Sequence, residues 1–418
     1  MNEKTEYQCT LFANRLKRKL KELKKWARKN RISCYRLYDR DIPEIPLSLD
    51  IYEFLPFGVN NQAEAARFII NQNERIAAND PTVQKEIAEN TYAVLYLFER
   101  PYEKDEDEEA LWFDAMADTA AQTLCIDKVH IVKKERKRQR GTNQYEKENK
   151  LNSNKASVSL EHAASASDDD RAALSQNRAT ADNSQNVRAA GSISVQSIKG
   201  ITQECGEIFN IDLTSYIDTG LFFDHRPLRS KIRDIAQKKS VLNLFCYTGS
   251  FSVYASQGGA RKVESVDLSN TYLNLAKENM ALNNFTDKGK FIYTRADCVE
   301  FLKEKALKAK DGSLKDDERY DIIILDPPTF SNSKNTYTVL DINRDWVQLV
   351  KDCLNILSPG GVLYFSTNST KLVFDKSKLP QATVSGKVIM VTDITEESIP
   401  KDFEGTKCHK AWEFKIGK

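Results

Sequence analysis

Apolar residues near the start of the chain recur every three or four positions, which is typical of an amphipathic helix with one buried stripe. The stripe comprises Phe12, Leu16, Leu20, Leu23 and Ala27. Shorter runs with strand or helix periodicity follow. The predicted strands are Ile32–Asp39, Leu47–Phe54, Tyr92–Arg100 and Lys128–Arg136, and the predicted helices are Ala63–Ala78 and Glu108–Leu124. This pattern predicts a small α+β domain over residues 1–147.

Positive charge is concentrated in two parts of this first domain. Ten Lys or Arg residues and a single acid, Glu22, lie between Arg15 and Arg31, and a second basic run extends from Lys133 to Arg140. Such clusters bind nucleic-acid phosphates by releasing counterions, and neighbouring aromatic side chains can stack on bases. A solvated helix face and a solvated loop are the alternatives. The candidate RNA contacts are Lys17, Arg18, Lys21, Lys24, Lys25, Arg136, Arg138, Arg140, Gln144, Tyr145 and, further along the chain, Lys334.

Residues 148–199 differ in composition from the segments on either side. They are rich in Ser, Ala, Asn and Asp and contain no Phe, Tyr or Trp. Such a segment buries too little apolar surface to offset the entropy lost on ordering. We therefore predict a disordered, low-complexity insertion here.

From residue 200 to residue 418 strand patterns alternate with helix patterns. The predicted strands are Lys239–Tyr247, Arg261–Ser269, Lys290–Asp297, Tyr320–Pro328 and Gly361–Asn368, and the predicted helices are Ser250–Gln257, Thr271–Asn283, Cys298–Ala309 and Asn343–Leu357. This alternation predicts an α/β fold with a doubly wound, Rossmann-like parallel sheet. Ligands of such sheets bind beyond the carboxyl ends of the strands.

Three predicted strands end in residues suited to a nucleoside that carries an amino-acid group. NLFCYTGSFS (243–252) contains a single glycine, Gly249, which allows close backbone approach but lacks the G-x-G-x-x-G spacing of a dinucleotide site. Asp267 ends the next strand, where a carboxylate can accept both ribose hydroxyls. Asp297 ends the third and is placed to accept an adenine amine. Helix capping is the alternative for both carboxylates.

The sequence DPPTFSNSK (326–334) follows the fourth strand and is the most specific of these motifs. Pro327 and Pro328 stiffen the turn, and they lack N–H groups, so nearby carbonyls are freer to face a pocket. Phe330 can stack on an extruded base. We therefore assign Asp326, Pro327, Pro328 and Phe330 to the catalytic side of the predicted cleft.

These motifs, with DTGLFFDHRPLR (218–229), ERKRQRGTNQYEK (135–147) and CHKAWEF (408–414), resemble bacterial 23S rRNA methyltransferases, in particular the RlmK-type guanine-N7 enzymes. Enzymes of that type form the C-terminal half of a fused protein. The likeness covers most of the chain except about residues 55–90 and 148–199, which resemble insertions. It implies a class I methyltransferase with S-adenosylmethionine (SAM) as cofactor, 23S rRNA as substrate and an RNA-facing front domain. The other half of the fusion, a guanine-N2 enzyme, is missing from the sequence, which suggests a separately encoded partner subunit.

The resemblance also implies roles for individual residues. His225 would lie in the wall of the cleft, and the turn around Tyr247 would hold the methionine part of SAM. Cys246 stands where the family often has Ser. The implied cofactor-binding residues are Asp218, Phe222, Asp224, Arg226, Phe245, Tyr247, Thr248, Gly249, Asp267, Leu268, Asp297, Cys298 and Asp326.

The expected chemistry needs no general base, because guanine N7 has a lone pair and no proton, so catalysis should come from positioning. Positive charge moves onto the purine, and Asp326 or Asp224 could stabilise it. A cytosine-C5 methyltransferase would need a thiolate, for which Cys246 and Cys298 are conceivable. A non-catalytic RNA-binding assembly factor and a small-molecule or protein methyltransferase are further alternatives.

Composition limits the class of protein but does not indicate a function. The net charge is only +2, and the eight cysteines include no C-x-x-C pair and no histidine at metal-ligand spacing. We therefore expect free thiols and no metal site. With no signal-peptide core and no run of 18 apolar residues, we expect a cytoplasmic protein without a membrane span. The target nucleotide and the oligomeric state stay open.

Overall fold

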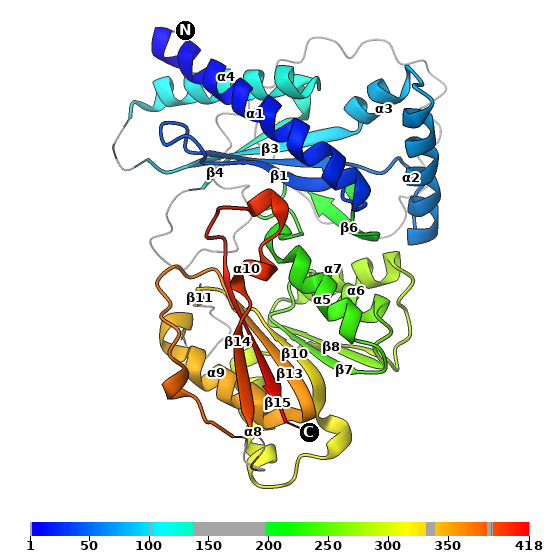
Figure 1. The fold of residues 1–418 in the computed structure, drawn as a ribbon, viewed down its shortest axis with the longest axis vertical. Helices are drawn as coiled ribbons and strands as arrows, with labels where there is room; N and C mark the ends of the chain where they lie inside the picture. The colour runs from blue at the N-terminus through cyan, green and yellow to red at the C-terminus, as the bar shows by residue number, and fades with distance from the viewer. Residues whose placement is uncertain are drawn as a thin grey trace, which may run out of the picture.

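The computed structural model describes residues 2–100, 102, 104–136, 197–331, 339–382, 386 and 388–417. Two units lie one above the other in Figure 1, and each has its own sheet. Most of the predicted low-complexity insertion lies outside the described residues. The same holds for the candidate RNA contacts Arg138, Arg140, Gln144, Tyr145 and Lys334.

The upper unit is an α+β layer whose four strands have the order β1-β2-β3-β4. The first three pair antiparallel, and β4 pairs parallel with β3. Four of the five predicted stripe residues of the first helix are buried and pack, together with α4, on one face of this sheet. The elements are α1 (Glu3–Lys29), β1 (Cys34–Asp39), β2 (Leu47–Glu53), α2 (Gln62–Ala77), α3 (Val83–Glu89), β3 (Thr91–Phe98), α4 (Glu106–Leu124) and β4 (Ile131–Arg136).

The lower unit contains a seven-stranded sheet of order β14-β15-β13-β10-β7-β8-β9. The strands from β13 to β9 pair parallel with their neighbours, whereas β15 pairs antiparallel with both β13 and β14. The sheet is therefore mixed, although the sequence predicted parallel strands throughout. Its elements are α5 (Arg226–Ile235), β7 (Ser240–Leu244), α6 (Ser250–Gln257), β8 (Lys262–Asp267), α7 (Asn270–Leu282), β9 (Phe291–Arg295), α8 (Cys298–Lys310), β10 (Tyr320–Leu325), α9 (Ile342–Ile356), β13 (Leu357–Thr367), β14 (Ile389–Asp393), α10 (Thr395–Ser398) and β15 (Lys410–Ile416). Two short ladders accompany it: β5 (Lys199–Glu204) with β6 (Glu207–Asp212), and β11 (Phe330–Ser331) with β12 (Leu340–Asp341).

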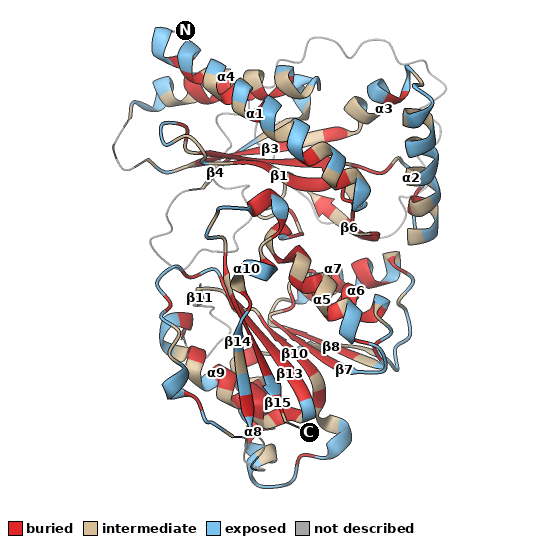
Figure 2. Ribbon diagram, in the orientation of Figure 1, coloured by how far each residue is buried: buried red, intermediate tan, exposed pale blue. Residues whose placement is uncertain are grey.

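Helices cover both faces of the lower sheet. Along β10, Ile322 and Ile324 belong to a core shared with α5 and α6, whereas Ile323 and Leu325 belong to a core shared with α8 and α9. A strand covered on both faces needs a continuous apolar run, which explains the sequence IIIL. Figure 2 shows the buried residues along the strands and the exposed residues on the outer helical surfaces.

The two units pack directly against each other. Tyr52 and Tyr96 of the upper sheet share a buried apolar cluster with Phe223 and Tyr254 of the lower unit. The Tyr52 hydroxyl also lies 2.8 Å from the Thr219 hydroxyl. The face of the upper sheet that is not covered by α1 and α4 is therefore the face turned toward the lower unit.

Several elements differ from the sequence prediction. The predicted strand Lys128–Arg136 begins with a 3₁₀ turn, Lys128–His130, because the side chain of Asp127 accepts the N–H of Val129 and starts that turn. Short or isolated patterns hid α3, the β5–β6 hairpin, α5 and the strands β14 and β15 at one end of the lower sheet. Among the described residues, no helix is both long and apolar enough to cross a membrane.

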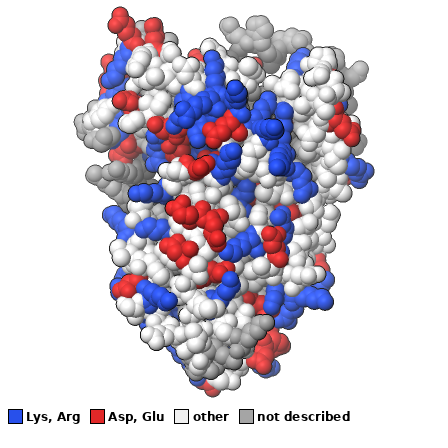
Figure 3. Space-filling view, viewed as in Figure 1, with Lys and Arg blue, Asp and Glu red and all other residues white. Residues whose placement is uncertain are grey.

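Basic side chains gather over α1. Lys17, Arg18, Lys21 and Lys25 are exposed and Lys24 is half-buried. Burial and the neighbouring Arg28 lower the pKa of Lys24. Figure 3 shows blue side chains collected on the upper unit, where α1 crosses the view. This surface lies on the face of the upper sheet that points away from the lower unit.

Candidate active site

The carboxyl ends of four neighbouring parallel strands lie side by side. β7 has β10 on one side and β8 on the other, and Leu244 pairs with both Leu325 and Val266 near the ends of these strands. β9 follows, with Asp267 opposite Arg295. The chain leaves β7 toward α6 on one face and leaves β10 toward α9 on the other face. Such a switch point is where doubly wound sheets bind ligands, and the four predicted motifs meet there.

The turn after β7, residues 245–249, has an unusual backbone. Phe245 and Tyr247 have φ angles of 54° and 50°, and Gly249 has 76°. The N–H of Tyr247 donates to Oδ2 of Asp267 at 3.0 Å, which ties this turn to the end of β8. A Cβ at position 249 would lie 2.8 Å from Cβ of Ala276 on α7. Helix packing therefore requires glycine here, in addition to its conformation.

The carboxylates at the ends of β8 and β9 have different surroundings. Asp267 accepts the N–H groups of Tyr247 and Ser269 through different oxygens, and burial raises its pKa. Ser269, and not Asp267, caps α7. Asp297 caps α8 by accepting the N–H of Val299 at 2.9 Å. This is the helix-capping role that the sequence offered as the alternative to adenine binding. Leu268, which directly follows Asp267, is half-buried.

An aromatic wall borders the turn. Phe222, 45% exposed, lies with its ring centre 5.2 Å from that of Tyr247, which in turn contacts Tyr272 edge-on at 4.7 Å. The Thr248 hydroxyl donates to the carbonyl of Gly220 at 2.6 Å and so joins the DTG segment to the turn. Near this wall, Asp218 pairs with the candidate RNA contact Arg136 at 3.3 Å.

The DPP motif extends the edge beyond β10. Oδ1 of Asp326 accepts a hydrogen bond of 2.6 Å from the Ser366 hydroxyl of β13. Pro327 is buried and Pro328 half-buried, whereas Phe330 is 44% exposed. Asp326 is thus held on the sheet, while the ring of Phe330 remains accessible to a ligand.

Histidines connect this motif to the DTG segment. Nε2 of His225 lies 3.5 Å from Oδ1 of Asp326, an ion-pair distance without hydrogen-bond geometry, and Nδ1 lies 3.4 Å from Asp224. The rings of His225 and His409 stack at 4.4 Å. Burial alone would lower the pKa of His225, but the carboxylates of Asp326 and Asp224 raise it to about 10.

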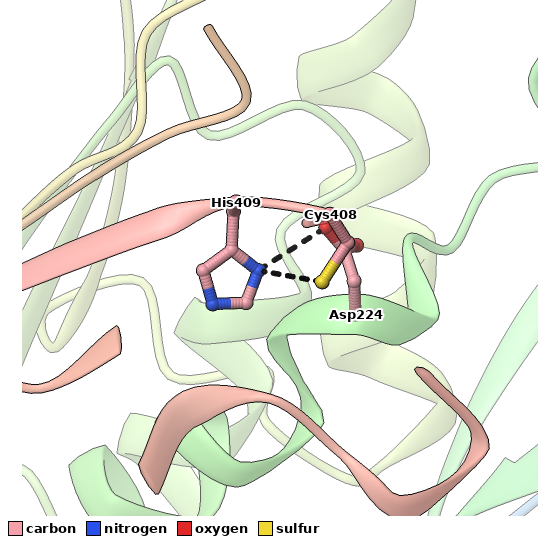
Figure 4. Close-up of side chains that lie close together, drawn as sticks. All are labelled: Asp224, Cys408 and His409. Carbon is pink, nitrogen blue, oxygen red and sulfur yellow. Dashed lines mark hydrogen bonds and ion pairs between the residues drawn. The ribbon is translucent and has the colours of Figure 1, made fainter. Parts of the chain in front are cut away.

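Figure 4 shows the second half of this cluster, Asp224 with Cys408 and His409. Nδ1 of His409 lies 3.4 Å from Asp224 and 3.5 Å from Sγ of Cys408, while Nε2 contacts the Ser398 hydroxyl at 2.7 Å. These three side chains have the composition of a metal site, with ligand atoms within 4.8 Å of one another. The contacts among these three side chains are hydrogen bonds within the protein. The sequence did not reveal the group because 185 positions separate Asp224 from His409.

Arg226, a predicted cofactor contact, is engaged elsewhere. Its guanidinium donates to Glu204 at 3.0 Å, to Asp402 at 2.7 Å and to the carbonyl of Cys34 at 3.0 Å. The side chain is 3% exposed. The neighbouring Arg229 binds the same Glu204. The structure therefore places Arg226 at the junction of the two units, apart from the residues gathered at the strand ends.

The cysteines near the strand ends are buried thiols. Sγ of Cys298 accepts the N–H of Phe245 at 3.2 Å beneath the turn. Burial raises the pKa of Cys298 and of Cys246 well above the usual value. Neither environment favours the thiolate that covalent catalysis needs.

Comparison with known proteins identifies the class. Residues 143–395 match the family model of S-adenosylmethionine-dependent methyltransferases. The chain is similar to Ribosomal RNA large subunit methyltransferase K/L of Pseudomonas aeruginosa (35% identity, 97% of this chain, 42% of the relative) and of Pseudomonas fluorescens (36%, 96% and 40%). It thus spans about two fifths of the length of these curated relatives. Among solved structures, SMU.776 complexed with SAH has a TM-score of 0.56 at 19% identity, covering 98% of this chain and 82% of that one.

The mixed seven-stranded sheet, with carboxylates at the ends of its parallel strands, and the family match together define the class of protein. The chain belongs to the S-adenosylmethionine-dependent methyltransferase family. It is an enzyme with SAM as its methyl donor, related to the ribosomal RNA large subunit methyltransferases K/L.

Proposed function

We propose that this chain transfers the methyl group of SAM to guanine N7 in 23S ribosomal RNA. The observation that carries the proposal is the match along 97% of the chain to relatives named as ribosomal RNA large subunit methyltransferases K/L. The resemblance of its motifs to the guanine-N7 half of such fused proteins supports the choice of atom. A guanine-N2 methyltransferase subunit is the partner that we propose for it.

The donors at the strand ends suit SAM. A carboxylate has about four lone-pair positions, so Asp267 retains acceptors for ribose hydroxyls after binding two backbone N–H groups. Asp297 would accept the adenine amine in addition to capping α8. The turn at residues 245–249 would hold the methionine part, next to the ring of Phe222. When bound, SAM supplies an electrophilic methyl group on a sulfonium.

On the opposite side, the residues of the DPP turn would receive the base. The ring of Phe330 would stack on an extruded guanine, and the rigid prolines would fix its distance from the sulfonium. Asp326 would stabilise the positive charge that develops on the purine. Since guanine N7 has no proton to lose, proximity and orientation supply the rest.

Two features favour N7 over cytosine C5. Cysteine-dependent C5 methylation needs a thiolate, but burial raises the pKa of both Cys246 and Cys298. Both thiols also lie on the side assigned to the cofactor, and Sγ of Cys298 is occupied beneath Phe245.

The experiment is methylation of unmodified 23S rRNA with labelled SAM, followed by nucleoside identification by mass spectrometry. We expect 7-methylguanosine. Labelled 5-methylcytidine would assign the transfer to cytosine C5, and labelled N2-methylguanosine would assign it to guanine N2. Either product would contradict the proposed target atom. SAM binding without transfer to 23S rRNA, with or without an added partner subunit, would contradict the proposed substrate.

A further inference from the structure

A charge cluster that includes Asp326 lies beside the side proposed for the base, and its histidine, His225, has no role in the chemistry described so far. It contains His225 between two carboxylates, with Oδ1 of Asp224 3.4 Å from Nδ1 and Oδ1 of Asp326 3.5 Å from Nε2. The exposed fraction of the His225 side chain is 7%. Nε2 makes no hydrogen bond despite its burial. A buried nitrogen without a hydrogen bond costs free energy, and the attraction between a protonated ring and the nearby carboxylates offsets that cost.

The two carboxylates need a cation between them. Like charges at close range destabilise each other, and Asp224 opposes the ionisation of Asp326. Among the described residues, His225 is the only basic group within ion-pair distance of Asp326. Burial opposes ionisation of Asp326 as well, but the His225 imidazolium lowers its pKa below the usual value.

We propose that His225 is a positioning residue, whose imidazolium holds Asp224 and Asp326 together as carboxylates and fixes Asp326 toward the target base. The inference rests on the proposed function, because it assigns Asp326 a role in stabilising charge on the purine. In this proposal His225 acts through Asp326 and not by direct contact with the base or SAM. Without the cation, the pKa of Asp326 would rise, so the carboxylate would be protonated and lose its electrostatic role at a higher pH than in the wild-type protein.

The remaining neighbours fit this arrangement. Ser366 on β13 fixes the same oxygen of Asp326 by a 2.6 Å hydrogen bond. His409, before β15, stacks on His225 and shares Asp224 with it, and Cys408 lies behind His409. From α6, Phe251 presents an uncharged ring edge. The cluster of two carboxylates and one imidazolium therefore keeps a net negative charge, which suits a reaction that passes positive charge from sulfur to purine.

The charge state of His225 can be measured without RNA. The chain has four histidines, so selective ¹⁵N-histidine labelling gives few ring signals, and His225→Gln identifies the one of interest. Because its pKa is raised from the usual 6.5 to about 10, both ring nitrogens should stay protonated at pH 8. The stabilising contribution of the cation should disappear only as the pH rises toward 10. Asp326→Asn should lower this pKa by at least about 1 unit. A neutral His225 at pH 7 would overturn the proposal.

The positioning role is tested by the pH dependence of methyl transfer at saturating SAM and RNA. In His225→Gln the acid limb should move upward by about 1–3 pH units, because a neighbouring opposite charge shifts a carboxyl pKa by that amount. His130→Gln is the matched control, since His130 lies in the upper unit, stacked on Tyr92. Its acid limb should coincide with that of the wild-type protein.

The possible results separate this inference from the proposed function. If the wild-type protein does not methylate 23S rRNA but His225 is cationic, the proposed function is wrong, whereas the ion pairing of His225 with the two carboxylates is supported. If the wild-type protein is active and His225→Gln leaves the acid limb unmoved, the positioning role is wrong. A general loss of folding in His225→Gln would appear in its SAM affinity, and Asp326→Asn would then supply the ring pKa instead.

Discussion

The two sides of the proposed site are held by different kinds of interaction. On the side proposed for the cofactor, backbone N–H groups bind Asp267, and left-handed residues shape the turn around Tyr247. On the side proposed for the base, side chains from distant parts of the chain hold Asp326. A constant cofactor suits a rigid backbone cradle, whereas an electrostatic site suits groups whose charges can be tuned. Substitutions on the two sides should therefore affect different measured quantities.

The largest effect is expected from Asp326→Ala. Removal of a preorganised electrostatic group typically slows the chemical step by about 10²–10³-fold, so single-turnover methylation should fall by at least about 100-fold. SAM affinity, measured by calorimetry, should change less than about threefold, because the proposal assigns Asp326 to the base and not to the cofactor. A full rate at saturating SAM and RNA would remove Asp326 from the mechanism.

Asp267→Asn should show the opposite pattern. Hydrogen bonds to a charged group contribute about 1.5–3 kcal/mol, so loss of the carboxylate should weaken SAM binding by about 10–100-fold. The rate at saturating SAM should fall much less. Asp311→Asn, at an exposed helix end, is the control and should bind SAM normally. Equal losses in rate and affinity for Asp267→Asn would contradict the separate roles proposed for the two sides of the site.

Gly249→Ala tests whether packing or conformation requires the glycine. The new Cβ would lie 2.8 Å from Cβ of Ala276, in a backbone with φ of 76°. Gly312→Ala is the matched control, because Gly312 has a similar φ of 80° and open space around it. Both should lose about 1 kcal/mol for the left-handed conformation, and Gly249→Ala should lose at least about 1 kcal/mol more through overpacking. Urea unfolding measures both, and equal losses would exclude the packing argument.

The smallest effect is expected from α1. Replacing Lys17, Lys21 and Lys25 by Ala should reduce the slope of log affinity for RNA against log salt by about 2, since each phosphate contact on a single strand contributes about 0.7. Lys303→Ala, on the exposed surface of α8, should leave the slope unchanged. Methylation at saturating RNA should be unaffected. An unaltered slope in the triple variant would make this surface a solvated helix face.

The sequence predicted the features that repeat locally. Short apolar runs alternating with helical patterns predicted five of the seven sheet strands, and the residues after them placed Asp267, Asp297 and Asp326 at the ends of strands in one sheet. It missed what depends on long-range contacts. Arg226 belongs to a motif near the cleft, yet it binds Asp402, 176 positions away. His409 joins Asp224 across a similar separation, and a lone histidine in a sequence carries no signal of such a contact.

The junction around Arg226 has a consequence for the substrate. Separating the two units would break the hydrogen bonds that the Arg226–Asp402 ion pair makes to the upper sheet, from Arg226 to the carbonyl of Cys34 and from the N–H of Arg36 to Asp402. Hydrogen bonds to charged groups contribute about 1.5–3 kcal/mol each. Hinge-like closure about this point is therefore disfavoured, and under the proposed function the protein is a stiff template for its RNA. The deformation needed for the reaction must then occur in the RNA, so a rigid, fully assembled ribosomal substrate should react more slowly than one whose target nucleotide is still loosely structured.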